Sequence, residues 1–280
     1  MNATTEETGT PRTRPEALPL HAEARRMTPA RLVRHTGALT WRLLVQLKHN
    51  PEPLFLLGAQ PILFLVLITY IYGGQFAGST GAYLQYALPG VMVYNAVFAT
   101  MSSAPSLFAD IGGGVFDRFR SMPIARSAPL IARVLADLML QAIALVFLLA
   151  VGFAMGFRIE TGVLHLLCGV VLIALFSVAL AWLPMLLALS IKSGDSVQMI
   201  LFVTTFPLSF ISGAFARVDT MPGWLQALVK VNPVTWLAQA ERALLTGGPV
   251  FRPVLYTLVC AVLLAAVFAP LAVRAFRRRD

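Results

Sequence analysis

Residues 163–191 read VLHLLCGVVLIALFSVALAWLPMLLALSI and contain no Asp, Glu, Lys or Arg. About 20 consecutive apolar residues are enough for an α-helix to cross the hydrocarbon core of a bilayer. Comparable apolar runs occur near 54–73, 84–108, 129–156, 197–215 and 253–273. Together these runs predict an all-α membrane protein with about six transmembrane helices.

The composition of the whole chain agrees with this prediction. Hydrophobic residues make up 58% of the sequence and charged residues only 12%, and the mean hydropathy is +0.75. A soluble domain carries about a quarter charged residues. The net charge is +9, but the basic residues flank apolar runs instead of gathering on a soluble folded face, as they would in a nucleic-acid-binding protein. We therefore expect membrane lipids around the chain and no nucleic acid as a partner.

The distribution of Lys and Arg predicts the orientation in the membrane. Loops that stay in the cytosol carry an excess of these residues. If the N-terminus is cytosolic, the basic residues at 12–48, 118–133, 192 and 274–279 lie inside, and those at 158, 217, 230, 242 and 252 lie outside, a ratio of roughly three to one. Because six spans return the chain to the side where it began, we expect both termini to be cytosolic and the protein to reside in the cytoplasmic membrane.

The N-terminal region divides into two parts before the first span. Residues 1–29 are polar, lack the apolar core of a signal peptide, and are expected to form a flexible cytosolic tail. Within 30–50, Leu32, Leu39, Leu43 and Leu47 recur at helical spacing, which is typical of an amphipathic helix on the cytosolic membrane surface. A cytosolic extension of the first span is the alternative. The prolines at 51 and 53 separate this segment from the transmembrane domain, which we place at 51–280.

The segment 216–252 before the last span is too long for a tight turn and too apolar for a free loop. Pro222 and Pro233 each precede a run with helical character, and Trp224 is suited to a membrane–water interface. This segment predicts a short helical hairpin on the outer face.

A search for chemistry gives no catalytic, cofactor-binding or metal-binding residues. A Walker loop ends in Gly-Lys-Ser/Thr, but Lys48, Lys192 and Lys230 follow Leu, Ile and Val. The four histidines lack metal-ligand spacing. Asp137 is the one carboxylate well inside a predicted span, and Arg133 precedes it by one helical turn. An acid inside the membrane is a functional candidate, but this spacing favours a structural ion pair over a proton relay.

Two groups of motifs resemble a known family. The first is the cytosolic loop 116–124, FDRFRSMPI, followed by Arg126 and by LIARVLAD at 130–137. The second comprises MPGWL at 221–225, NPVTW at 232–236 and ERALLTG at 241–247. In this order, with six spans and a surface helix, they resemble the membrane permease subunits of type-2 ATP-binding-cassette exporters, particularly daunorubicin-resistance permeases.

This resemblance implies a transport subunit without an ATPase site of its own. Cytosolic ATP-binding-cassette ATPase subunits would bind ATP and magnesium, and a second permease copy or a sister permease would complete the assembly. The substrate would be a hydrophobic drug, lipid or glycolipid that moves outward. The resemblance assigns ATPase coupling to the loop 109–128, and its candidate residues are Asp117, Arg118, Arg120, Pro123 and Arg126. The outer hairpin contributes Pro222, Trp224, Asn232, Pro233, Glu241 and Arg242.

Two other classes remain compatible with the residues alone. A membrane enzyme that modifies lipids and a membrane scaffold would share the composition and the predicted spans. A neighbouring gene for an ATPase with a Walker motif would favour the exporter over both.

Overall fold

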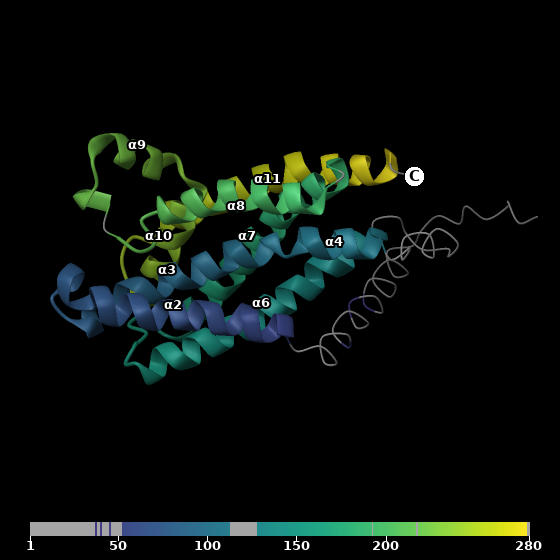
Figure 1. Ribbon diagram of the computed structural model, residues 1–280. Helices are drawn as coiled ribbons and strands as arrows, with labels where there is room; N and C mark the ends of the chain where they lie inside the picture. Colours follow the sequence, from purple (N-terminus) through teal and green to yellow (C-terminus); the bar gives the residue numbers. More distant parts are fainter. Residues whose placement is uncertain are drawn as a thin grey trace, which may run out of the picture.

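The computed structural model describes residues 37, 40, 45, 52–112, 128–191, 193–216 and 218–278 of the chain. In these residues the structure is all-α, and long helices lie side by side in a bundle (Figure 1). The helices are α2 (Glu52–Ala77), α3 (Thr80–Met101), α4 (Ser103–Gly112), α6 (Ala128–Ala154), α7 (Val163–Ser190), α8 (Gly194–Phe210), α9 (Gly223–Val231), α10 (Pro233–Thr246) and α11 (Phe251–Arg278), with a 3-10 turn η1 at Val218–Thr220. The predicted all-α class is confirmed.

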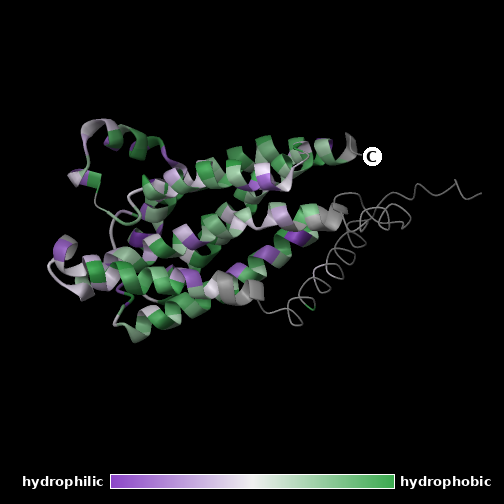
Figure 2. Ribbon diagram, viewed as in Figure 1, coloured by the Kyte–Doolittle hydropathy of each residue, from purple (hydrophilic) through white to green (hydrophobic). Residues whose placement is uncertain are grey.

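Three of the described helices are long and apolar enough to cross a membrane on their own. They are Ile131–Ala154 in α6, Val163–Ser190 in α7 and Phe251–Phe276 in α11. Each coincides with a predicted span, and their outward faces are largely hydrophobic (Figure 2). The chain is therefore a membrane protein, and α2, α3 and α8 lie in the same bundle at three further predicted spans.

Helix α3 has the most enclosed position in the bundle. It packs against α2, α6, α7, α8 and α10, and Leu88 on α3 lies in one core with Leu148, Ile173 and Leu237. A helix that is surrounded by protein does not need an apolar face toward lipid. This explains why α3 tolerates the buried polar residues Asn95 and Thr100.

The structure divides two of the apolar stretches that the sequence presents as continuous. Within 84–108, α3 ends at Met101 and α4 begins at Ser103, because Pro105 has no N–H to continue the helical ladder toward Met101. Within 197–215, α8 ends at Phe210, and the chain then turns through Gly213 at a φ of +67°. Positive φ is easily reached only by glycine.

Two predicted segments lie largely outside the described residues. The surface helix at 30–50 is described only at Gly37, Thr40 and Val45, all three in helical conformation. The Thr40 hydroxyl lies 3.4 Å from the Ala132 carbonyl and donates to it, so this segment contacts the beginning of α6. The loop at 109–128 is described only where α4 ends at Gly112 and α6 begins at Ala128.

Gly90 allows the turn after α8 to approach α3 closely. A Cβ atom at position 90 would lie 2.8 Å from the carbonyl carbon of Ala214 and closer still to its oxygen. These are backbone atoms, so the contact can be relieved only if the turn or the helix moves. By contrast, a Cβ atom added to Gly81, in the first turn of α3, would lie in open space.

We predict that Gly90→Ala lowers the stability of the folded chain by about 1–3 kcal/mol, the usual cost of forcing a methyl group into a packed interior. Gly81→Ala is the matched control and should be neutral or raise stability by up to about 1 kcal/mol, since alanine favours the helix. The measurement is thermal unfolding of the detergent-solubilised protein. Equal stability of the two variants would contradict the close approach of α3 and Ala214.

Candidate functional site

A stripe of polar side chains runs along one face of α6. Arg133, Asp137 and Gln141 are spaced four residues apart, and this spacing places them on the same side of an α-helix. The face meets the break between α3 and α4 on one side and α7 on the other, where Ser103 and Ser177 lie. We call these five residues the polar stripe.

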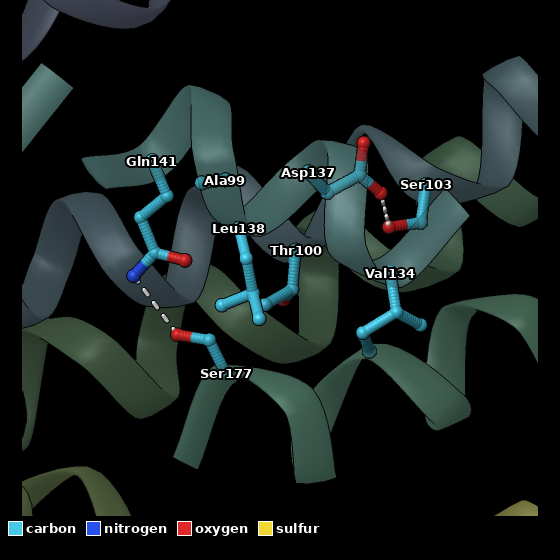
Figure 3. Close-up of a pocket in the computed structure, with 9 residues that line it drawn as sticks. Ala99, Thr100, Ser103, Val134, Asp137, Leu138, Gln141 and Ser177 are labelled. Atoms are coloured by element: carbon cyan, nitrogen blue, oxygen red, sulfur yellow. Dashed lines mark hydrogen bonds between the residues drawn. The ribbon is translucent and has the colours of Figure 1, made fainter. Parts of the chain in front are cut away.

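Hydrogen bonds join the polar stripe to both neighbouring helices (Figure 3). The Ser103 hydroxyl donates to Asp137 Oδ2 at 2.5 Å, and Gln141 Nε2 donates to the Ser177 hydroxyl at 2.9 Å. The predicted ion pair is present, with Arg133 Nε 3.2 Å from Asp137 Oδ1. The two atoms are not aligned for a hydrogen bond, so their attraction is mainly electrostatic. Asp137 therefore connects α6 to α4 and stays paired with a cation of its own helix.

The space enclosed by the polar stripe has room for about one water molecule. Its remaining lining is formed by Ala99, Thr100, Val134, Leu138 and Ala181. A cavity of this size cannot hold a drug or a lipid. The polar stripe is therefore suited to holding α4, α6 and α7 together, and it stands at the end of the bundle where α4 leads into residues 113–127 and α6 leads out of them.

The helical hairpin predicted before the last span is present. Pro222 stands at the N-cap of α9, Asn232 at the N-cap of α10, and Pro233 at the first position of α10. Asn232 Oδ1 accepts from the Val234 N–H at 2.9 Å, and Asn232 Nδ2 donates to the Leu208 carbonyl at 2.6 Å. Asn232 thus begins α10 and attaches it to α8. Trp224 on α9 projects outward and is 68% exposed.

Arg242 on α10 holds the turn that follows α8. Its Nη2 donates to the carbonyls of Gly213 at 2.9 Å and Ala214 at 2.6 Å, and its Nε donates to the Tyr86 carbonyl at 3.1 Å. The guanidinium carbon lies 3.7 Å from the centre of the Tyr86 ring, a cation–π geometry. Burial lowers the pKa of Arg242 from its ordinary value. Because arginine cannot lose its proton in a protein, these carbonyls and the ring must accommodate a full positive charge.

Two tyrosines of α3 complete the attachment of this turn. The Tyr83 hydroxyl donates to the Phe215 carbonyl at 2.9 Å. The Tyr86 hydroxyl lies within hydrogen-bond distance of the carbonyls of Gly213, at 2.8 Å, and Ala216, at 2.9 Å. Arg242, Tyr83 and Tyr86, with the carbonyls of residues 213–216, form a unit that we call the turn clamp. It fixes α3, the end of α8 and α10 to one another.

Glu241 is next to Arg242 in sequence but faces a different helix. Its side chain is fully buried against Gly169 of α7. Within the described part of the chain, neither of its carboxylate oxygens has a hydrogen-bond partner. Burial raises the pKa of Glu241 to about 8, so the buried carboxyl holds its proton at neutral pH.

The remaining predicted site residues lie outside the described part of the chain. Asp117, Arg118, Arg120, Pro123 and Arg126 all belong to residues 113–127. Their coupling role therefore stays a prediction.

The structure also brings together residues that the sequence analysis did not select. Gln141 has a recognisable signal, since it lies one helical turn after Asp137 on a predicted span. Tyr83 and Tyr86 have the three-residue spacing of a shared helix face. Ser103 and Ser177 carry no distinguishing signal, because serine is common in membrane helices and either residue could have faced lipid.

Comparison of the sequence with known proteins identifies the family of this chain. The model of the ABC-2 type transporter family matches residues 34–246, and the chain belongs to this family. It is similar to the daunorubicin resistance ABC transporter permease protein DrrB1 of Streptomyces coeruleorubidus, with 36% identity over 254 residues that cover 90% of each chain. It is also similar to the doxorubicin resistance ABC transporter permease protein DrrB of Mycobacterium tuberculosis, with 26% identity over 235 residues, 78% of this chain and 81% of the relative. The chain is a transmembrane permease subunit of an ATP-binding-cassette exporter.

We predict that Arg242→Gln destabilises the protein by about 1–3 kcal/mol for each buried carbonyl that is left without a donor. Arg242→Lys keeps the charge but loses the forked geometry, and its stability should lie between that of Arg242→Gln and that of the wild type. Arg158→Gln is the control, because the Arg158 side chain is exposed and its guanidinium donates to the adjacent Phe157 carbonyl. Thermal unfolding in detergent measures the effect. A stability loss no larger for Arg242→Gln than for Arg158→Gln would contradict the turn clamp.

Proposed function

We propose that this permease moves a hydrophobic compound outward across the cytoplasmic membrane, with the energy supplied by ATP hydrolysis in separate subunits. The observation that carries the proposal is the similarity over 90% of both chains to a permease named for daunorubicin resistance. A drug is accordingly the first substrate class to test, and lipids and glycolipids share the apolar character that such a pathway needs. The orientation with both termini in the cytosol rests on the excess of Lys and Arg in the loops predicted to be cytosolic.

The chain depends on its partners for nucleotide chemistry. None of its three lysines follows a glycine, so the sequence contains no Walker loop to bind phosphate. ATP and magnesium are bound by cytosolic ATP-binding-cassette subunits in this proposal. A second copy of this chain or a sister permease completes the membrane part, and lipids surround the exposed apolar faces of α6, α7 and α11.

The polar stripe supports a route for coupling between the ATPase and the membrane helices. In the sequence, residues 113–127 follow α4 and precede α6, and the Ser103–Asp137 hydrogen bond joins the same two helices within the bundle. A displacement of this loop by the ATPase would therefore act on two helices that are already braced together. Asp117, Arg118, Arg120, Pro123 and Arg126 are the proposed contacts with the ATPase.

We predict that the purified chain neither binds nor hydrolyses ATP, and that ATP turnover and drug export appear only with the partner ATPase. The measurement is phosphate release and ATP-driven daunorubicin accumulation in inverted vesicles, with and without the partner. A partner variant without its catalytic carboxylate is the control for contaminating ATPases. Turnover by the isolated chain would contradict the proposed division of labour, and turnover without accumulation of drug would contradict a drug as substrate.

We predict that the double variant Arg118→Ala/Arg120→Ala still inserts into the membrane but loses the ATPase. Truncating one member of a partly desolvated charge pair weakens association by about 2–5 kcal/mol, which corresponds to at least tenfold. Co-purification of the ATPase and export should both fall.

Arg12→Ala/Arg14→Ala is the matched control, because it removes the same charge from the predicted N-terminal tail. Membrane abundance should be unchanged in both double variants. Normal ATPase recovery and normal export in Arg118→Ala/Arg120→Ala would return the loop to the role of an orientation signal only.

A further inference from the structure

Glu241 is a buried acid to which neither the turn clamp nor the polar stripe assigns a role. Its side chain is 0% exposed, and no described residue offers either of its carboxylate oxygens a hydrogen bond. It fits because Gly169 of α7 has no side chain, since a Cβ atom at that position would lie 2.5 Å from Glu241 Oε2 and 3.3 Å from Glu241 Oε1. The contact between α10 and α7 therefore leaves space for the Glu241 carboxyl group, although no described residue in the contact hydrogen-bonds to it.

Among the described residues of the surrounding elements, no charged side chain compensates Glu241. On α10 itself, Arg242 is engaged by the turn clamp, and the hydroxyls of Tyr83 and Tyr86 on α3 donate to carbonyls of that same turn. The charged and titratable groups His165 and Cys168 on α7, Arg252 and Tyr256 on α11, Lys230 on α9 and Asp195 on α8 are exposed, and Cys260 on α11 is partly exposed. Burial is accordingly the cause that raises the pKa of Glu241.

In the described residues, no hydrogen bond joins α7 itself to α10 near Glu241. Hydrogen bonds from Arg242 and Asn232 tie α10 to α3 and to the end of α8. On the α7 side, the described hydrogen bonds are confined to the C-terminal end of α10, where the Glu160 N–H donates to the Leu245 carbonyl at 3.0 Å and the Thr161 hydroxyl donates to the Leu244 carbonyl. Separation of α10 from α7 near Glu241 would break apolar contacts only.

We call the contact of α10 with α7 around Glu241 and Gly169 the seam. We propose that the seam is a gate controlled by protons on the outer side, with Glu241 as its titrating group. This inference rests on the proposed function for the outer location of α10. In the closed seam Glu241 is a neutral carboxylic acid. When the seam opens, the O–H bond of the acid breaks, the proton passes to outer water, and the carboxylate is hydrated. Closure takes one proton back from outer water, so the cycle balances without any other reactant.

The direction of the pH dependence follows from the two protonation states. The closed seam holds the proton with a pKa of about 8, whereas a hydrated glutamate titrates near 4.5. Between these values opening releases a proton, so a more acidic outer solution favours the closed seam. The ratio of open to closed seams should rise by up to about tenfold for each pH unit in this interval and should stop rising above pH 8.

The test measures the seam directly in the full-length chain. Spin labels at Gln239→Cys on α10 and Leu164→Cys on α7 occupy exposed positions on the two sides, in a background in which Cys168 and Cys260 are replaced by Ala. The protein is reconstituted in lipid nanodiscs and diluted with unlabelled chain, so that each assembly carries one labelled copy. Pulsed electron paramagnetic resonance then gives the distance distribution between pH 5.5 and 8.5.

We expect a longer distance to gain population as the pH rises in the wild type. Glu241→Gln cannot ionise and should remain at the short distance throughout. Glu241→Met is a second non-ionising variant, which keeps the test decisive if the glutamine variant does not fold. An unchanged distance distribution in the wild type over this range, or the same pH response in the non-ionising variants, would overturn the proposal.

A second readout is independent of motion. Dicyclohexylcarbodiimide reacts with protonated carboxyls in apolar surroundings, so mass spectrometry should find modified Glu241 at pH 6 and little at pH 9. Equal labelling at the two pH values would contradict the titration. The outcome also separates this inference from the proposed function: failure of ATP-driven export with a normal seam response would reject the exporter assignment, whereas export with no seam response would reject the gate.

Discussion

A helix break inside an apolar bundle exposes backbone N–H and carbonyl groups that lipid cannot hydrogen-bond, so the protein itself must supply their partners. The main polar contacts of this protein do so. Between α8 and α9 the chain leaves helical geometry, and the carbonyls of residues 213–216 receive hydrogen bonds from Arg242, Tyr83 and Tyr86. At the break between α3 and α4, the Ser102 hydroxyl donates to the Ala99 carbonyl at 2.7 Å. The turn clamp thereby pairs carbonyl groups that a turn packed against α3 and α10 would otherwise leave without donors.

The same requirement explains which features of the fold could be predicted from the sequence. The apolar runs at 129–156, 163–191 and 253–273 predict transmembrane helices, because a single apolar segment can satisfy its backbone hydrogen bonds in lipid only as a helix. The hairpin at 216–252 was also predictable, since Pro222 and Pro233 mark helix starts and Asn232 is a favoured N-cap residue. The pair Arg133 and Asp137 followed from their spacing on one helix. These are local signals, and each depends on residues close together in the chain.

Contacts between distant segments could not be predicted in this way. Arg242 reaches the Tyr86 carbonyl across 156 positions of sequence, whereas the sequence assigned it to the outer hairpin without indicating what it would contact. Gly90 and Gly169 look like ordinary helix glycines, and only the packing shows that one admits the Ala214 backbone and the other a carboxyl group. In each case the decisive property is what lies opposite the residue, which depends on how the helices pack against one another.

Glu241 and Arg242 show how the chemistry of a side chain decides the way in which a bundle accommodates it. The two residues are adjacent on α10, yet they do not pair, because consecutive residues on a helix point in directions about 100° apart. A guanidinium group stays charged, so its position must provide acceptors, and the carbonyls of residues 86, 213 and 214 do so. A carboxylate can become neutral by taking up a proton, so its position needs only space, which Gly169 provides. The cation therefore became a fixed attachment, whereas the acid kept a dependence on the surrounding proton concentration.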